Sequence, residues 1–263
     1  HTMTSHPDPE VLVTRDDHLD ENIAWVTINY PTRLNVLNAE LIAKLTPAIR
    51  ELAEDADLRA VVLTGAGNRA FIGGADIKEF SALDPEGAEA FITRIHEVCQ
   101  AVRDCPVPVI ARIDGFCLGA GFEVAASCDL RIASTTSVFG MPEVKVGVPS
   151  VIEAALLPRL IGWGRTNELL LTGENITADE AFRLGFLERV VPADDLDDDV
   201  RKWLESIIAA GPRAVRLQKE LIRKWEMLPV DAAIQEGIRM FRRSFETDEP
   251  KRYAEPFLNR KKR

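Results

Sequence analysis

Positive charge is scarce in this chain of 263 residues, where 32 Lys and Arg face 42 Asp and Glu and leave a formal net charge of −10. Nucleic acids and anionic membrane surfaces attract positive potential, so this balance argues against either partner. The exception is a basic tail, Asn259-Arg260-Lys261-Lys262-Arg263. Such a tail is either simply solvated or placed to meet a phosphate group.

Cysteine is also rare, and long apolar runs are absent. The four cysteines, Cys99, Cys105, Cys117 and Cys128, show neither CxxC spacing nor a small secreted disulfide framework. Their apolar neighbours predict free, buried thiols, which suits a reducing cytoplasm. No apolar run approaches the roughly 18 residues of a membrane span, and we find no signal peptide. We interpret His1-Thr2-Met3 as the remnant of a tag.

The apolar residues that are present follow alternating strand and helix patterns. Apolar or β-branched runs predict strands over 23–28, 60–64, 107–113 and 130–133. Helices are predicted after the N-cap Asn38, over 87–102 and from about residue 119. Because wholly apolar strands need helices on both faces, the pattern predicts an α/β fold.

After about Gly162 the pattern becomes mostly helical. A capping box over 177–180 opens one helix, and a short strand is predicted over 187–191. Helical segments follow near 195–209, 212–225 and 230–245. We therefore predict one α/β domain over 10–193 and a C-terminal helical region over 194–263, whose apolar faces pack on another protomer.

The stretch Gly119-Ala120-Gly121-Phe122-Glu123 places a carboxylate among small and apolar residues. Small residues let a ligand approach the backbone closely, and free N–H groups at a helix start can stabilise an oxyanion. A carboxylate in apolar surroundings is costly unless it is paired or functional. Glu123 is therefore a candidate catalytic residue, the alternatives being a pair with a distant arginine or an outward-pointing side chain.

Two other stretches carry weaker signals of the same kind. Glu143 follows Pro142, which predicts a rigid, irregular turn where a carboxylate is either solvated or functional. Gly73-Gly74 precedes a predicted helix start, which indicates either an ordinary turn or a second close approach to a ligand.

Taken in order, these stretches resemble the crotonase (enoyl-CoA hydratase/isomerase) superfamily over nearly the whole chain. The resemblance implies a crotonase-like ββα spiral with a C-terminal helical trimerisation region, and an enoyl-CoA hydratase of fatty acid or lipid metabolism. The motifs that carry it are Pro31-Thr32-Arg33-Leu34-Asn35-Val36-Leu37, Gly73-Gly74-Ala75-Asp76-Ile77-Lys78, Gly119-Ala120-Gly121-Phe122-Glu123, Met141-Pro142-Glu143, Leu171-Thr172-Gly173, Ala181-Phe182-Arg183-Leu184-Gly185-Phe186 and Val190-Val191-Pro192.

The resemblance also implies the roles of site residues. The backbone N–H groups of Ala75 and Ala120 would form the oxyanion hole for the thioester carbonyl, provided that Ala120 keeps a negative φ where hydratases usually have glycine. Glu143 would be the acid/base nearest C2, and Glu123 would activate water for addition across the 2,3 double bond. No metal or redox cofactor is expected, since coenzyme A is part of the substrate.

Coenzyme A would lie along two segments of the chain and meet a neighbouring protomer. Phe257 and Arg260 match the places of a C-terminal phenylalanine and lysine that complete the nucleotide pocket in related hydratases, which form trimers or dimers of trimers. Arg260 keeps the charge needed to hold a phosphate. The residues expected along the coenzyme within one chain are Arg33, Leu34, Val36, Ala75, Asp76, Ile77 and Lys78.

One loop departs from the family pattern. Hydratases follow the second glutamate with a glycine-rich loop, but this sequence reads Gly147-Val148-Pro149-Ser150-Val151-Ile152-Glu153 and is one residue shorter. Ser150 stands where a glycine N–H helps to hold the catalytic water. Glu153 is either a third carboxylate near the site or a first-turn residue that suits a helix dipole.

This loop leaves the reaction and the acyl group open. A water beside a polarised carbonyl could also attack C1, so a hydrolase of acyl-CoA is an alternative, as is an enoyl-CoA isomerase. A non-catalytic RNA-binding relative is a third alternative, which the acidic charge and both glutamates oppose.

Overall fold

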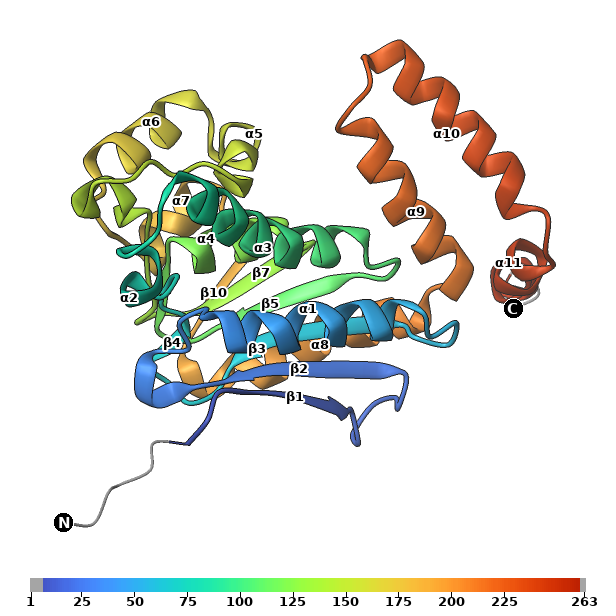
Figure 1. Cartoon of the computed structure of the whole chain (residues 1–263). Coiled ribbons are helices and arrows are strands. Elements are labelled where there is room, and N and C mark those ends of the chain that lie inside the picture. Colours follow the sequence, from blue (N-terminus) through green and yellow to red (C-terminus); the bar gives the residue numbers. More distant parts are fainter. Residues whose placement is uncertain (1–6, 261–263) are drawn as a thin grey trace.

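The computed structural model describes residues 7–260 of the chain (Figure 1). The presumed tag remnant and the last three residues of the basic tail lie outside this range. Ten strands form two sheets in the described part. The larger sheet has the order β1 (Glu10–Arg15), β2 (Ile23–Asn29), β3 (Ala60–Gly65), β5 (Val109–Ile113), β7 (Leu130–Ser134) and β10 (Arg189–Val191), parallel except for the β1–β2 pair.

The smaller sheet runs beside it, and from β3 to β8 successive strands alternate between the two sheets. Its order is β4 (Ala70–Ile72), β6 (Phe116–Leu118), β8 (Val138–Gly140) and β9 (Ile176–Thr177), with only the β8–β9 pair antiparallel. The chain thus repeats a unit in which one strand joins the large sheet, the next joins the small sheet, and a helix follows. This repetition is the ββα spiral that the family resemblance implies.

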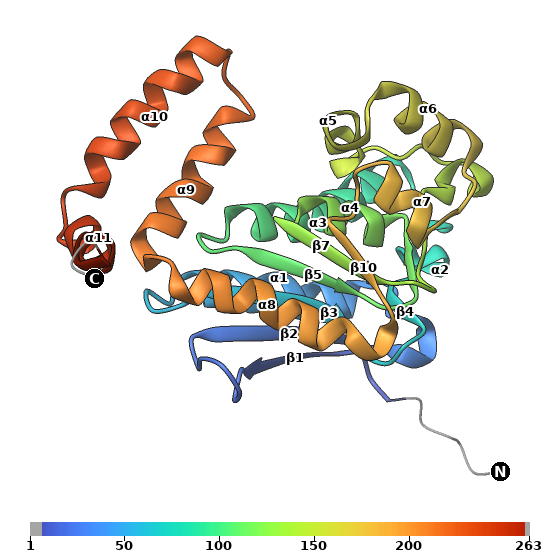
Figure 2. The same ribbon diagram turned by 180° about the vertical axis from the view of Figure 1, so that it is seen from behind.

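Helices cover both faces of the large sheet. On one face lie α1 (Ala39–Ala53) and α3 (Pro85–Asp104), and on the other lies α8 (Leu196–Ala209) (Figures 1 and 2). Along β3, Val61 and Leu63 pack into the core under α1 and α3, whereas Ala60 and Val62 pack with α8. Burial on both sides explains why this strand is wholly apolar.

The short helices and 3-10 turns lie mainly between the strands and around the small sheet. The α-helices are α2 (Ile77–Phe80), α4 (Ala120–Ser127), α5 (Leu157–Ile161), α6 (Trp163–Thr172) and α7 (Ala178–Arg183). The 3-10 turns are η1 (Pro31–Arg33), η2 (Pro142–Val146), η3 (Glu153–Leu156) and η4 (Ala193–Asp195). The predicted caps are confirmed, because Asn38 accepts from the N–H of Leu41 and Thr177 from that of Glu180.

The C-terminal helices α9 (Pro212–Trp225), α10 (Val230–Ser244) and α11 (Glu249–Asn259) extend away from the sheets (Figures 1 and 2). α8, which the predicted division at 193/194 groups with them, instead packs on the large sheet through Leu196, Val200 and Leu204. α9 and α10 share a small apolar contact of Leu217, Leu221 and Met240.

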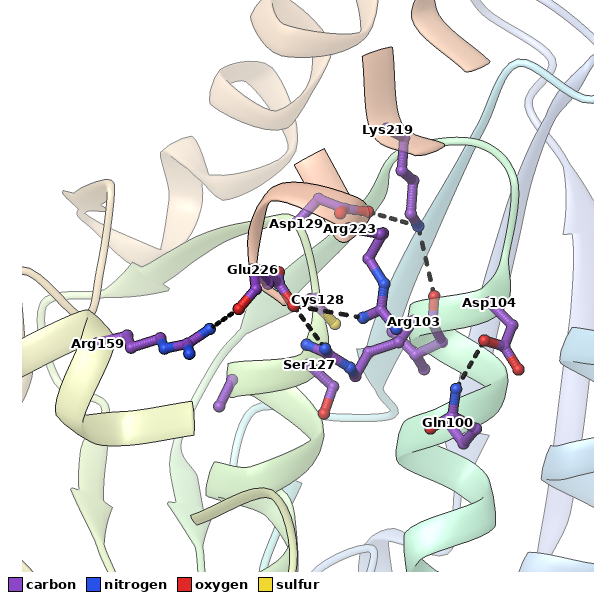
Figure 3. Close-up of polar contacts among 12 residues, drawn as sticks. Gln100, Arg103, Asp104, Ser127, Cys128, Asp129, Arg159, Lys219, Arg223 and Glu226 are labelled. Carbon is purple, nitrogen blue, oxygen red and sulfur yellow. Dashed lines mark hydrogen bonds and ion pairs between the residues drawn. The ribbon is translucent and has the colours of Figure 1, made fainter. Parts of the chain in front are cut away.

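Polar contacts join α9 to the main domain (Figure 3). The Nζ of Lys219 lies 2.8 Å from Asp129 and donates to the carbonyl of Val107 at 2.9 Å. Arg103 of α3 pairs with Glu226 at 2.6 Å. Lys219 is almost fully buried, so these contacts fix the base of the C-terminal helices.

The prediction of free, buried thiols is confirmed for all four cysteines. Over residues 7–260, no helix combines the length and the apolar character that crossing a membrane requires.

Candidate active site

The N-terminus of α4 is built around glycines that leave room for other groups. Gly119 caps the helix with a φ of 55°, and a Cβ there would lie 2.9 Å from Oε1 of Glu143. A Cβ on Gly121 would lie 2.2 Å from the carbonyl oxygen of Ile72 in β4. The absent side chains therefore let α4 begin directly beside β4 and Glu143.

Two backbone N–H groups are left free at this place. The N–H of Leu37 donates to Gly74 (2.8 Å) and the carbonyl of Leu37 accepts from Asp76 (3.0 Å), so these bonds flank Ala75 in a parallel bridge. The N–H of Ala75 consequently points away from Leu37. Ala120 is the first residue of α4, and a first-turn N–H has no partner within its helix. Ala75 precedes α2 by two residues and Ala120 opens α4, so both predicted oxyanion donors lie at or near a helix start.

Ala120 and Ser150, which stand where hydratases usually have glycine, need a backbone conformation outside the left-handed region, and both have it. Among the described residues other than glycine, only Leu34 and Asn35 have a positive φ, of 54° and 52°. Ala120 and Ser150 therefore lie outside the left-handed region, and each can present its N–H as the sequence analysis required.

Asn35 fixes the loop that carries the expected coenzyme contacts. Its side chain accepts from the N–H of Tyr30 and donates to the carbonyls of Ala66 and Ala70, at 2.8, 3.1 and 2.8 Å. The residue is fully buried. Two consecutive left-handed residues are sparsely populated in free chains, and these bonds hold them in place.

The free N–H groups and both glutamates border one cavity of about 510 Å³. Its walls are mainly apolar side chains of α2, α3 and the segment after η2, several of them exposed at the mouth. The lining residues are Gly74, Ala75, Ile77, Phe80, Leu83, Ala88, Glu89, Phe91, Ile92, Ile95, Gly119, Ala120, Glu123, Pro142, Glu143, Val146, Val148, Pro149, Ser150 and Val151. Such a largely apolar cavity with a few convergent polar groups is typical of a small-molecule site.

Glu123 lies in the first turn of α4 and is only 3% exposed. Its Oε2 accepts from the N–H of Ala154 at 2.9 Å. Burial raises the pKa of Glu123 from 4.5 to about 8, with further contributions from the charges of Glu143 and Glu153. The side chain does not point into solvent, and no arginine in residues 7–260 forms an ion pair with it.

Glu143 follows Pro142 in η2 and is half-buried rather than solvated. Its Oε2 accepts from the hydroxyl of Ser150 at 2.9 Å. Burial raises the pKa of Glu143, and the hydroxyl of Ser150 opposes that rise. The predicted water-positioning residue is therefore bonded directly to the predicted acid/base at C2.

Glu153 opens η3, as its helix-start interpretation requires, but it is also buried to 7% exposure. Its Oε1 lies 2.5 Å from Nδ1 of His96 on α3. Sequence reasoning missed His96, because one histidine beside the apolar positions of a helix gives no sign of a partner 57 residues away.

The structure brings the predicted coenzyme segments together but leaves α11 apart. Gly73 donates to the carbonyl of Leu34 at 2.8 Å, which joins the 33–36 loop to the 73–78 segment. Of the predicted coenzyme residues in these segments, Ala75 and Ile77 line the cavity. Arg33, Ile77 and Lys78 are exposed, and Leu34, Val36, Ala75 and Asp76 are half-buried. α11, which carries Phe257 and ends at the C-cap Arg260, lies on the far side of the chain from α2 (Figures 1 and 2). The guanidinium of Arg260 lies 5.3 Å from the ring of Phe257.

The arrangement suits chemistry on a carbonyl compound. Two N–H donors can stabilise charge on the carbonyl oxygen, and two carboxylates on the same cavity can move protons at neighbouring carbons. Over residues 7–260 no cluster of three or more His, Cys, Asp or Glu side chains could hold a metal ion.

Comparison with known proteins gives one consistent family. The family model described as enoyl-CoA hydratase/isomerase matches residues 18–263. A short-chain-enoyl-CoA hydratase of Clostridium acetobutylicum is 36% identical over 91% of this chain and 92% of its own length. A crotonyl-CoA hydratase of Syntrophomonas wolfei is 34% identical over 92% and 94%. The crystal structure of an enoyl-CoA hydratase from Bacillus anthracis superposes with a TM-score of 0.90 at 32% identity, covering 95% of this chain and 96% of that one.

The chain therefore belongs to the enoyl-CoA hydratase/isomerase family. The predicted crotonase fold is confirmed by the superposition. The predicted class of enzyme, a hydro-lyase that acts as an enoyl-CoA hydratase, is confirmed by the family match and these relatives.

Proposed function

We propose that this enoyl-CoA hydratase uses Glu123 and Glu143 as its two proton-transferring groups, with Ala75 and Ala120 as the oxyanion hole. The observation that carries the proposal is that both glutamates and both alanines line one largely apolar cavity. Polarisation of the thioester carbonyl by two N–H donors lets enolate character develop at C2, which conjugate addition of water requires. Each such donor contributes on the order of 3 kcal/mol to the transition state.

The two carboxylates are suited to opposite protonation states. Burial favours the neutral form of each, and their charges repel, so the pair holds one proton over a range of pH. Glu123 is more deeply buried and keeps that proton in the free protein. This state is ready for dehydration, in which Glu123 protonates the departing hydroxide and Glu143 accepts the proton from C2. Hydration runs from the opposite state, with ionised Glu123 deprotonating water.

The substrate proposed is a 2-enoyl-CoA with a short acyl chain. Apolar side chains of α3, among them Phe91, Ile92 and Ile95, line the cavity and suit an apolar acyl group. The named relatives act on short-chain enoyl-CoA and crotonyl-CoA, which supports the same range here. Water addition without metal or redox cofactor, and a place in fatty acid metabolism, stay predictions.

The test is crotonyl-CoA turnover, followed at the enoyl-thioester absorbance, for the intact protein and for Glu123→Gln and Glu143→Gln. General acid–base groups contribute about 10²–10⁴-fold, so each variant is expected to lose activity by that factor. Glu168→Gln removes an exposed carboxylate on α6 and serves as the control. Free thiol is assayed in the same tubes, since thiol release would indicate hydrolysis, and an isomerase would tolerate the loss of one glutamate.

We further propose that the chain forms a trimer or a dimer of trimers through its C-terminal helices. Large apolar side chains there are exposed in the single chain, as Met227 (80%), Phe241 (70%) and Phe257 (67%) illustrate. A patch of this kind favours burial against another protein surface. Phe257 and Arg260 would then contact the coenzyme of a neighbouring protomer. Sedimentation velocity would test the assembly, and a cytoplasmic location and the lack of nucleic-acid or membrane partners stay predictions.

A further inference from the structure

A third carboxylate, Glu153, immediately precedes the residue whose N–H binds Glu123. It is 7% exposed, and it does not belong to the cavity lining. Its Oε1 is bound to Nδ1 of His96 at 2.5 Å, whereas its Oε2 is buried and has no hydrogen-bond partner in residues 7–260. An ionised oxygen left in this position is costly, so the residue needs an explanation beyond packing.

Glu153 is linked to Glu123 through the backbone and through charge. The residue after Glu153, Ala154, donates its N–H to Oε2 of Glu123 at 2.9 Å. The charge of Glu153 also acts on Glu123, in the direction that favours the protonated form. Neither Glu153 nor Ala154 lines the cavity, so this link does not run through the substrate site.

His96 is the only part of this arrangement that reaches solvent freely. Its side chain is 45% exposed, while that of Glu153 is 8% exposed. The remaining titratable groups that face Glu123 are Glu143 from η2 and the thiol of Cys99 from α3. Burial raises the pKa of Cys99, with the charge of Glu153 adding to the rise, so this thiol stays neutral and brings no counter-charge.

We propose that Glu153 is a positioning residue for Glu123, with His96 as its counter-ion: the charge of Glu153 opposes ionisation of Glu123, and a proton on His96 offsets that charge. The proposal rests on the catalytic role proposed for Glu123. When His96 is protonated, the ion pair is neutral overall and Glu123 ionises more readily. When His96 is neutral, the unbalanced carboxylate holds the proton on Glu123.

The experiment compares the pH dependence of kcat and kcat/KM for crotonyl-CoA hydration in the intact protein, Glu153→Gln and His96→Gln. Hydration needs the singly protonated pair, so the falling limb of the profile reports loss of the proton that Glu123 holds in the free protein. Glu153→Gln removes the opposing charge, so the limb is expected to move to lower pH, on the order of one pH unit. His96→Gln removes the offset, so the limb is expected to move to higher pH by a similar amount.

Two control variants make the same substitutions, His to Gln and Glu to Gln, at exposed positions away from the site. His18→Gln breaks an exposed contact with Asp17, and Glu168→Gln removes an exposed carboxylate of α6. Neither should move the limb. Circular dichroism and thermal melting of each variant would establish that it folds, and both glutamine replacements keep a hydrogen-bonding side chain of similar size.

Opposite movements of the limb in Glu153→Gln and His96→Gln would support the proposal. Unmoved limbs, or limbs that move in the same direction, would overturn it, even if kcat falls, because a merely structural contact changes rate without changing ionisation. Glu123→Gln separates this outcome from failure of the proposed function. If that variant stays active, the role of Glu123 is wrong, whereas an inactive Glu123→Gln with unmoved limbs contradicts only the part assigned to Glu153 and His96.

Discussion

Replacing Glu123 by glutamine should stabilise the fold near neutral pH while removing the proposed base. Burial raises the pKa of Glu123 from 4.5 to about 8 in the folded protein. Between these values the folded chain holds a proton on Glu123 and the unfolded chain does not. The carboxyl must therefore be kept neutral at a cost that a glutamine side chain does not incur.

The sign and size of the effect follow from this difference. Because the folded-state pKa is raised, the contribution of Glu123 to stability is fully present below about pH 4.5 and is lost as the pH rises toward 8. At about 1.4 kcal/mol per pH unit, the whole span amounts to on the order of 5 kcal/mol. Between pH 5.5 and 8 the loss is about 3 kcal/mol.

The measurement is urea unfolding followed by circular dichroism at pH 5.5 and at pH 8, for the intact protein and for Glu123→Gln. Protein concentration is held constant, since assembly would otherwise shift the apparent stability. The difference in free energy of unfolding between the two proteins should shift by about 3 kcal/mol in favour of Glu123→Gln from pH 5.5 to pH 8. A gap that is the same at both pH values would refute the reasoning, and Glu168→Gln should show no such change.

Three further substitutions test the architecture of the site. Gly121→Ala places a Cβ 2.2 Å from the carbonyl of Ile72, so we expect a loss of at least 1–3 kcal/mol in urea unfolding, roughly the cost of overpacking. Asn35→Ala removes the side-chain partner of three backbone groups, one of them buried, and a lowered melting temperature corresponding to about 3 kcal/mol is expected. Ser150→Ala removes the hydroxyl that donates to Glu143, so the pKa that governs the acid/base step should rise by up to about one pH unit. No comparable loss of stability is expected. An unchanged pH profile in Ser150→Ala would contradict that role.

The large sheet could be predicted from the sequence because its central strands carry a strong local signal. The run Ala60-Val61-Val62-Leu63-Thr64 is apolar on both faces, and helices with clear caps follow it. β1 was missed, because five of its six residues are exposed and leave no buried face to detect. α11 was missed as well, although its first turn contains a proline, as helix starts often do.

The small sheet could not be predicted by the same reasoning. Its strands have two or three residues, such as Ile176–Thr177, which is too short for any periodicity. Each strand exists because the neighbouring turn of the spiral presents a partner, so its cause lies far away in the sequence. The contact between Glu153 and His96 has the same character, and no local pattern at either residue could reveal it.

The segment that departs most from the family pattern is the one that contacts both proposed catalytic groups. Ser150 binds Glu143, and the N–H of Ala154 binds Glu123, so the residues between them fix the position of both carboxylates at once. His96 holds this segment against α3, whose Ile95 lines the cavity. A change in the part of the cavity wall formed by α3 can therefore affect Glu123 and Glu143 through the contact between His96 and Glu153. We infer that the substituted loop replaces the glycine-rich one with a different way of orienting the two proposed catalytic acids, Glu123 and Glu143.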